Sequence, residues 1–168
     1  MSYSIPTKNQ SKMAKRLIEC VPNFSEGRDM TVIKQITDVI ESIGGVQLLD
    51  IDPGKATNRT VVTFVGAPDS VIEAAFQAMK KAIEVIDMRK HNGEHPRHGA
   101  TDVCPLIPIS GVTMEETVAY AHQLAERVGQ ELQYPIYMYE SAATKPAWKN
   151  LATIRAGEYE ALPEKLQQ

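Results

Sequence analysis

The order of strand-like and helix-like segments limits what this chain can fold into more than any other feature. Apolar residues recur at helical spacing over 32–43, where two glycines end the pattern, and again over 71–86. A capping box of Ser70 and Glu73 is expected to open the second of these helices. Four apolar segments are typical of strands, and they span residues 16–22, 46–51, 59–65 and 103–109. The order is therefore strand, helix, strand, strand, helix, strand.

That order is typical of the split βαβ arrangement of ferredoxin-like domains. We expect an α+β fold, a ferredoxin-like βαββαβ sandwich with a mixed, mostly antiparallel sheet and its helices on one face. The opposite face must then meet solvent, a ligand or another domain. Because Pro105 and Pro108 cannot donate ladder hydrogen bonds, the strand over 103–109 suits the edge of the sheet.

A further helix and a further strand are expected to extend this core. Thr113 and Glu116 form a second capping box, which predicts a helix that runs to Leu132. Residues 136–139 are expected to form a short last strand. The tail from Ser141 onward is expected to be irregular, with little helix.

The composition excludes several classes of protein. The 168 residues fit one domain, and the 43% hydrophobic and 23% charged content is that of an ordinary soluble globular protein. The net charge of -3 gives no basic surface for nucleic acid, and no apolar stretch approaches the roughly 20 residues that cross a bilayer. Cys20 and Cys104 lie in apolar segments, which favours buried reduced thiols and a cytoplasmic location. We expect neither a nucleic-acid partner nor a membrane.

The first residues differ from the rest of the chain. Residues 1–15 are polar, carry several lysines and lack the apolar core of a secretory signal. We interpret 1–15 as a disordered leader and 16–168 as the domain.

Candidate chemistry gathers in residues 91–99, the histidine loop, which reads His-Asn-Gly-Glu-His-Pro-Arg-His-Gly. The Asn-Gly pair and the proline forbid a continuous helix there, and histidine changes charge near neutral pH. From the residues alone, His95 is either a proton-transferring group or a loop residue without chemistry. We interpret His91 and His98 as solvated. A metal site on the loop is conceivable by ligand type, but the spacing matches no standard zinc pattern, so we expect no metal.

Three polar residues outside the loop leave alternatives open. Asp52 follows a strand and is either a catalytic acid or a cap for the turn before Pro53-Gly54. Asn23 is either a turn residue or a hydrogen-bonding group in a pocket. Asp102 is expected to cap or to form a salt bridge locally.

Six stretches carry a resemblance to a known family. In order along the chain they are 19–27 (Glu-Cys-Val-Pro-Asn-Phe-Ser-Glu-Gly), 50–52, 57–60, 93–99, 102–105 and 154–160 (Ile-Arg-Ala-Gly-Glu-Tyr-Glu). Together, and at matching intervals from about Leu17 onward, they closely resemble the N-terminal subdomain of glutamate formimidoyltransferase. The same enzyme forms the first part of formimidoyltransferase-cyclodeaminase.

The resemblance implies a reaction in histidine degradation and one-carbon metabolism. A formimino group passes from N-formimino-L-glutamate to N5 of tetrahydrofolate, the cosubstrate, which gives 5-formiminotetrahydrofolate and glutamate. The family's catalytic histidine matches His95, and Asp52 is the candidate carboxylate against its second ring nitrogen. Arg59 or Arg97 could bind a substrate carboxylate bidentately, and Asn23 is a further candidate for binding. The family needs no metal.

The resemblance also implies a missing half. In the family, two similar subdomains face each other across the folate, whereas this chain ends at Gln168, near the expected linker. We therefore expect the second subdomain to be absent, with a second subdomain, a separate chain or a homo-oligomer completing the pocket. The alternative function is a lone, non-catalytic subdomain that acts as a binding or regulatory partner. His98 stands at a position where the family usually carries other residues.

Overall fold

The computed structural model describes residues 15–96 and 98–167. The expected leader at 1–15 lies outside the described residues except for Lys15, and Arg97 also lies outside them. The strands are β1 (Leu17–Cys20), β2 (Asn23–Phe24), β3 (Val46–Gly54), β4 (Arg59–Gly66), β5 (Thr101–Val103) and β6 (Leu106–Ser110). The longer helices are α1 (Met30–Glu41), α2 (Pro68–Val85) and α3 (Met114–Arg127).

The strands form one sheet in the order β5-β2-β4-β1-β6, with β3 paired to β4. β1 and β2 follow each other along one side of β4, and β3 runs along its other side. β6 and β5 pair with β1 and β2. Every one of these pairings is antiparallel, which confirms the expected mostly antiparallel sheet. The proline-containing segment at 103–109 lies at the edge, as predicted, and is split between β5 and β6.

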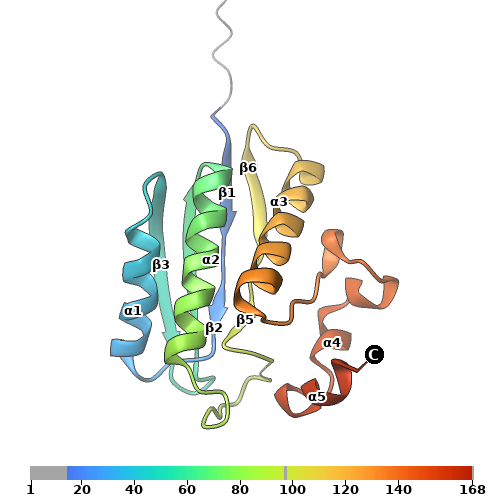
Figure 1. Cartoon of the computed structure of the whole chain (residues 1–168). Coiled ribbons are helices and arrows are strands. Elements are labelled where there is room, and N and C mark those ends of the chain that lie inside the picture. The colour runs from blue at the N-terminus through green and yellow to red at the C-terminus, as the bar shows by residue number, and fades with distance from the viewer. Residues whose placement is uncertain (1–14, 97, 168) are drawn as a thin grey trace, which may run out of the picture.

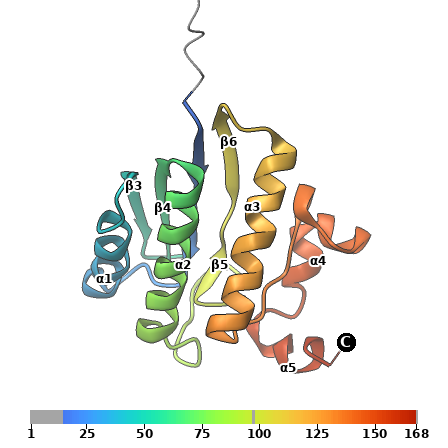
Figure 2. The ribbon, with the colours of Figure 1, turned by 45° about the horizontal axis from the view of Figure 1, so that its top comes forward.

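The three long helices cover one face of the sheet. Figures 1 and 2 show α1, α2 and α3 side by side on that face, while the C-terminal segment lies beside α3 and the edge formed by β5 and β6. Among residues 15–96 and 98–167, no long helix lies on the opposite face, which we call the open face.

The core explains which side chains reach the open face. Along β4, Thr60, Val62 and Phe64 are fully buried, whereas the residues between them are only partly buried. Because successive side chains of a strand point to opposite faces, the buried set faces the helices and the alternate set, which includes Arg59, faces away. The α2 residues Val71 and Phe76 belong to the same core.

The start of the second helix differs from the prediction. α2 begins at Pro68 with Ala67 as N-cap, and no side chain caps it, so the expected capping box of Ser70 is wrong. A proline in the first turn fits there because its missing N–H has no helical partner in any case. Glu73 instead forms an ion pair with Arg127 of α3. The capping box of Thr113 and Glu116 is confirmed.

The last part of the chain also differs. Residues 136–139 form no strand, because this segment packs through side chains rather than through a backbone ladder. Tyr134 and Ile136 pack against the core, and Tyr137 makes edge contacts with His98 and Trp148. A π-turn at Val128–Leu132 continues α3 to the predicted end of its helix. The tail contains more helix than expected, all of it in short pieces: 3-10 turns at Glu140–Ala142, Pro146–Lys149 and Tyr159–Ala161, and helices α4 (Leu151–Arg155) and α5 (Leu162–Lys165).

Candidate active site

The histidine loop is held against the turn that joins β3 to β4. The backbone N–H of Glu94 donates to the carbonyl of Ala56 (3.1 Å), and the side-chain amide of Asn58 donates to the carbonyl of Asn92 (2.9 Å). The ring Nε2 of His91 lies 2.7 Å from the Asn58 carbonyl oxygen, and His91 is only 8% exposed. The interpretation of His91 as solvated is therefore wrong, since its ring helps to anchor the loop.

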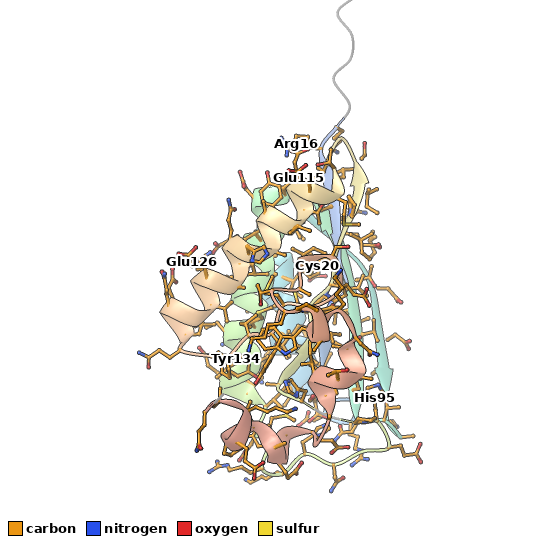
Figure 3. The ribbon with its side chains drawn as sticks, turned by 90° about the vertical axis from the view of Figure 1, so that its right-hand side faces the viewer. Arg16, Cys20, His95, Glu115, Glu126 and Tyr134 are labelled. Atoms are coloured by element: carbon orange, nitrogen blue, oxygen red, sulfur yellow. The ribbon has the colours of Figure 1, made fainter. Side chains whose placement is uncertain are left out.

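His95 is half-buried and contacts Arg59. Its Nδ1 lies 2.6 Å from the carbonyl oxygen of Pro96 and 2.7 Å from the Nη1 of Arg59. Because the carbonyl oxygen can only accept, we assign the ring proton to Nδ1. Nε2 then carries the lone pair and accepts from the Nη1 of Arg59 at 2.6 Å. Figure 3 shows His95 at the end of the sheet, away from the part of α3 that carries Glu115 and Glu126.

Arg59 belongs to a buried charge cluster with Asp102 and Arg155. Its Nη1 lies 3.0 Å from the Oδ2 of Asp102, and Arg155 contacts the same oxygen. The side chains of Arg59, Asp102 and Arg155 are 15%, 2% and 18% exposed. Burial lowers the pKa of the Arg59 guanidinium, the Asp102 carboxylate opposes that shift, and Arg155 adds to it. One carboxylate between two guanidiniums leaves an uncompensated positive charge.

Two other predicted residues lie in one row across the sheet. Val61 of β4 pairs with Asp52 of β3 on one side and with Asn23 of β2 on the other. Directly paired residues of antiparallel strands share a face, and Val61 belongs to the same alternate set as Arg59. Asp52 and Asn23 therefore belong to the open face, on which Arg59 also lies.

The structure separates the alternatives for these residues only in part. Asn23 lies in a strand, so the interpretation as a turn residue is wrong, and its buried Oδ1 has no hydrogen-bond partner among the described residues. Asp52 is exposed, and within the part of the chain that the structure describes no hydrogen bond joins it to His95.

Comparison with known proteins identifies the family. The formiminotransferase domain, N-terminal subdomain, matches residues 17–168. The chain belongs to this family. It is 54% identical over 153 residues to the formimidoyltransferase-cyclodeaminase of Dictyostelium discoideum, covering 91% of this chain and 28% of the relative. It is 52% identical over 154 residues to the glutamate formimidoyltransferase of Streptococcus pyogenes serotype M1, covering 92% of this chain and 51% of the relative.

More distant relatives match over the same region. The chain is 25% identical over 155 residues to a formiminotransferase cyclodeaminase-like protein of Arabidopsis thaliana, covering 89% of this chain and 52% of the relative. The chain thus spans about half the length of some curated relatives and 28% of others.

Two residues of this family member were not predicted as part of the site. Asp102 was expected to pair locally, but it pairs with Arg59 and Arg155, which lie far from it in the chain. Both residues lie in stretches that carry the family resemblance, 102–105 and 154–160, but that signal gives neither residue a role, because only the folded C-terminal segment brings Arg155 to β5. Nothing in the sequence near either residue shows which strand and which segment will meet.

A cavity lies away from His95. It has a volume of about 370 Å³ between α3, the β5–β6 edge and the C-terminal segment, and its lining includes His98, Asp102 and Arg155 but not His95. Within residues 15–96 and 98–167, no group of three or more His, Cys, Asp or Glu side chains could hold a metal ion. The described helices are all too short or too polar to span a bilayer.

Proposed function

We propose that this chain supplies the catalytic-histidine half of a glutamate formimidoyltransferase. The reaction moves the formimino group of N-formimino-L-glutamate to N5 of tetrahydrofolate and gives 5-formiminotetrahydrofolate and glutamate. Membership of the family supports this function, and one observation assigns it to a site: the His95 ring lies against the partly buried Arg59 guanidinium, with Nη1 at 2.6 Å from Nε2 and 2.7 Å from Nδ1, at the end of the open face.

The proposed chemistry needs one group that both accepts and donates a proton. As N5 of the folate attacks the formimino carbon, its proton passes to Nε2 of His95, which releases the hydrogen bond that it accepts from Nη1 of Arg59. The same proton then passes to the glutamate nitrogen as the bond from that nitrogen to the formimino carbon breaks. Proton transfer by a positioned imidazole contributes typically ~10²- to 10⁴-fold to the rate. No metal is required, because each charge that develops lies on a nitrogen.

Arg59 can bind substrate while it contacts His95. Its Nη1 is taken up by His95 and Asp102, whereas none of the hydrogen bonds among the described residues uses its Nε or Nη2. That edge of the guanidinium presents two parallel donors, which suit a carboxylate. We therefore propose that Arg59 binds a glutamate carboxylate of a substrate, with Arg97 of the same loop as a second candidate.

Asp52 and Asn23 are proposed to complete this surface. Asp52 would stabilise positive charge on the formimino nitrogens and the imidazolium, because its carboxylate lies on the open face in the row next to Arg59. Asn23 would accept a hydrogen bond from a ligand, since a buried oxygen without a partner is costly unless something fills that role.

We also propose a ferredoxin-like topology, the limits of the domain, a partner that covers the sheet, and a cellular location. The strand order supports a ferredoxin-like domain over 16–168 once β1 with β2, and β6 with β5, are each counted as one interrupted strand. Exposed apolar side chains, Leu49, Ile107 and Ile109, support a cover over the sheet. That cover would be a second subdomain, a separate chain or a second copy. The free thiols of Cys20 and Cys104 support a cytoplasmic location.

The test measures glutamate release that depends on tetrahydrofolate. The chain is assayed alone and with the C-terminal half of the Streptococcus pyogenes relative added, as wild type, His95→Gln and His122→Gln. His122 is the matched control because it is exposed on α3. We expect His95→Gln to lower the rate by ~10²- to 10⁴-fold and His122→Gln to leave it unchanged. A His95→Gln protein with the wild-type rate would contradict the mechanism. Tight binding to the added half without turnover would instead favour the non-catalytic partner.

A further inference from the structure

We propose that Asp102 is a positioning residue: together with Arg155 of the C-terminal segment, it fixes the Arg59 guanidinium beside the reacting imidazole. This inference rests on the proposed function, because it assigns a role within the same site. It extends the site from the histidine loop to β5 and to α4, which lies near the end of the chain.

The first step of the argument is the geometry of one nitrogen. Nη1 of Arg59 lies 3.0 Å from the Oδ2 of Asp102, and it lies 2.6 Å from the Nε2 and 2.7 Å from the Nδ1 of the His95 ring. A guanidinium nitrogen of this kind carries two hydrogens, so it can donate to the carboxylate and to the ring at once. Because the guanidinium is planar and rigid, fixing Nη1 also fixes the direction in which the Nε–Nη2 edge points. Asp102 thereby sets both the contact with the ring and the position of the edge proposed for substrate.

The second step concerns burial. Asp102 is 2% exposed and lies in β5, so water competes little for its charge and the strand backbone holds it in place. Its Oδ1 has no hydrogen-bond partner among the described residues. Both guanidiniums therefore converge on Oδ2, and no other described hydrogen bond holds the carboxylate.

The third step assigns the role of Arg155. Arg155 ends α4, whose Ile154 is 4% exposed and anchors the C-terminal segment. With Arg155 present, the cluster carries one more positive than negative charge, so Asp102 does not neutralise Arg59 completely. The remaining charge favours a negatively charged ligand group, and we assign that group to a carboxylate of N-formimino-L-glutamate. A cluster that only tied the C-terminal segment to the sheet would predict no such preference.

The test uses Asp102→Asn, which preserves the shape of the side chain and removes its charge, with Glu73→Gln as the matched control. Glu73 pairs with Arg127 between α2 and α3, outside the site. Under the assay conditions above, we expect Asp102→Asn to lower kcat/KM for formimino-glutamate on the order of 100-fold, as expected when a reacting group is misplaced. The KM for formimino-glutamate should rise, because the loss of the Arg59 position outweighs the gain in positive charge, and the KM for tetrahydrofolate should not change. Glu73→Gln should change neither value.

A second readout does not depend on turnover. In proton–nitrogen correlation spectra, the ring signals of His95, assigned by their loss in His95→Gln, should move in Asp102→Asn and stay in place in Glu73→Gln. If the wild-type chain shows no turnover in any mixture, the proposed function is contradicted. The ring signals of His95 still test whether Asp102 positions Arg59 beside the ring. Unmoved ring signals in a folded Asp102→Asn protein would overturn the inference, as would equal changes in both KM values.

Arg155 variants keep the inference testable if Asp102→Asn does not fold. Arg155→Gln leaves the pair of Arg59 and Asp102 neutral, so the fold is expected to persist and the ring signals of His95 to move. Arg155→Lys retains a cation, so the ring signals of His95 should return to their wild-type positions. Its KM for formimino-glutamate should lie close to the wild-type value. Equal behaviour of the glutamine and lysine variants would overturn the role of Arg155.

Discussion

The buried charge cluster makes a quantitative prediction for stability. Replacing Asp102 with asparagine leaves two guanidiniums close together without their carboxylate. Breaking a buried ion pair by removing one partner costs about 3–5 kcal/mol. Arg59 and Arg155 are 15% and 18% exposed, so both guanidiniums can regain some hydration. We therefore expect the free energy of unfolding to fall by about 3 kcal/mol, the lower end of that range.

Equilibrium unfolding in urea measures this loss. Far-UV circular dichroism follows the helices, and fluorescence follows Trp148, the single tryptophan, which contacts Tyr137 in the C-terminal segment. Glu73→Gln is the control, because its pair with Arg127 is 38% and 32% exposed and such surface pairs contribute about 0–1 kcal/mol. A loss of less than 1 kcal/mol in Asp102→Asn, equal to the control, would refute the reasoning, since the cluster would then be solvated.

Three further predictions follow from single side chains. Gly93→Ala should displace the histidine loop and lower activity, because a Cβ would lie 2.3 Å from the Thr57 carbonyl oxygen, whereas Gly44→Ala, with nothing within 4 Å, should preserve it. Thr113→Ala should cost about 1 kcal/mol in urea unfolding through loss of the cap of α3, and a cost near zero would argue against that cap. Burial lowers the pKa of His98 below its usual 6.5, so its contribution to stability is full above about pH 6.5 and is lost as the pH falls. His98→Gln should therefore flatten that part of the curve of unfolding free energy against pH, and an unchanged curve would contradict the burial of this ring.

Local signals predicted most of the fold. The spacing of apolar residues and the two glycines after it located α1, and the apolar run over 59–65 located β4. Thr113 was a reliable start signal because a capping box acts within one turn of helix. At the second helix the same reasoning failed, since Pro68 in the first turn was the stronger signal.

The parts that could not be predicted depend on contacts between distant segments. Residues 136–139 have strand-forming side chains, but their partners are aromatic rings and the core rather than a strand edge. In the same way, the sequence indicated His95 through its neighbours but gave no reason to join Asp102 to Arg155. Such pairings depend on which segments the folded sheet brings together, and that information is spread over the whole chain.

Protection of His95 by tetrahydrofolate tests the central claim most directly. Diethyl pyrocarbonate modifies accessible histidines, and mass spectrometry of peptides gives the rate at each ring with and without the folate, in the chain alone and with the added half. If folate binds beside His95 on the open face, tetrahydrofolate should slow the modification of His95 by diethyl pyrocarbonate. Exposed His122 should be modified at an unchanged rate. Equal rates at His95 with and without folate in both mixtures would contradict the account.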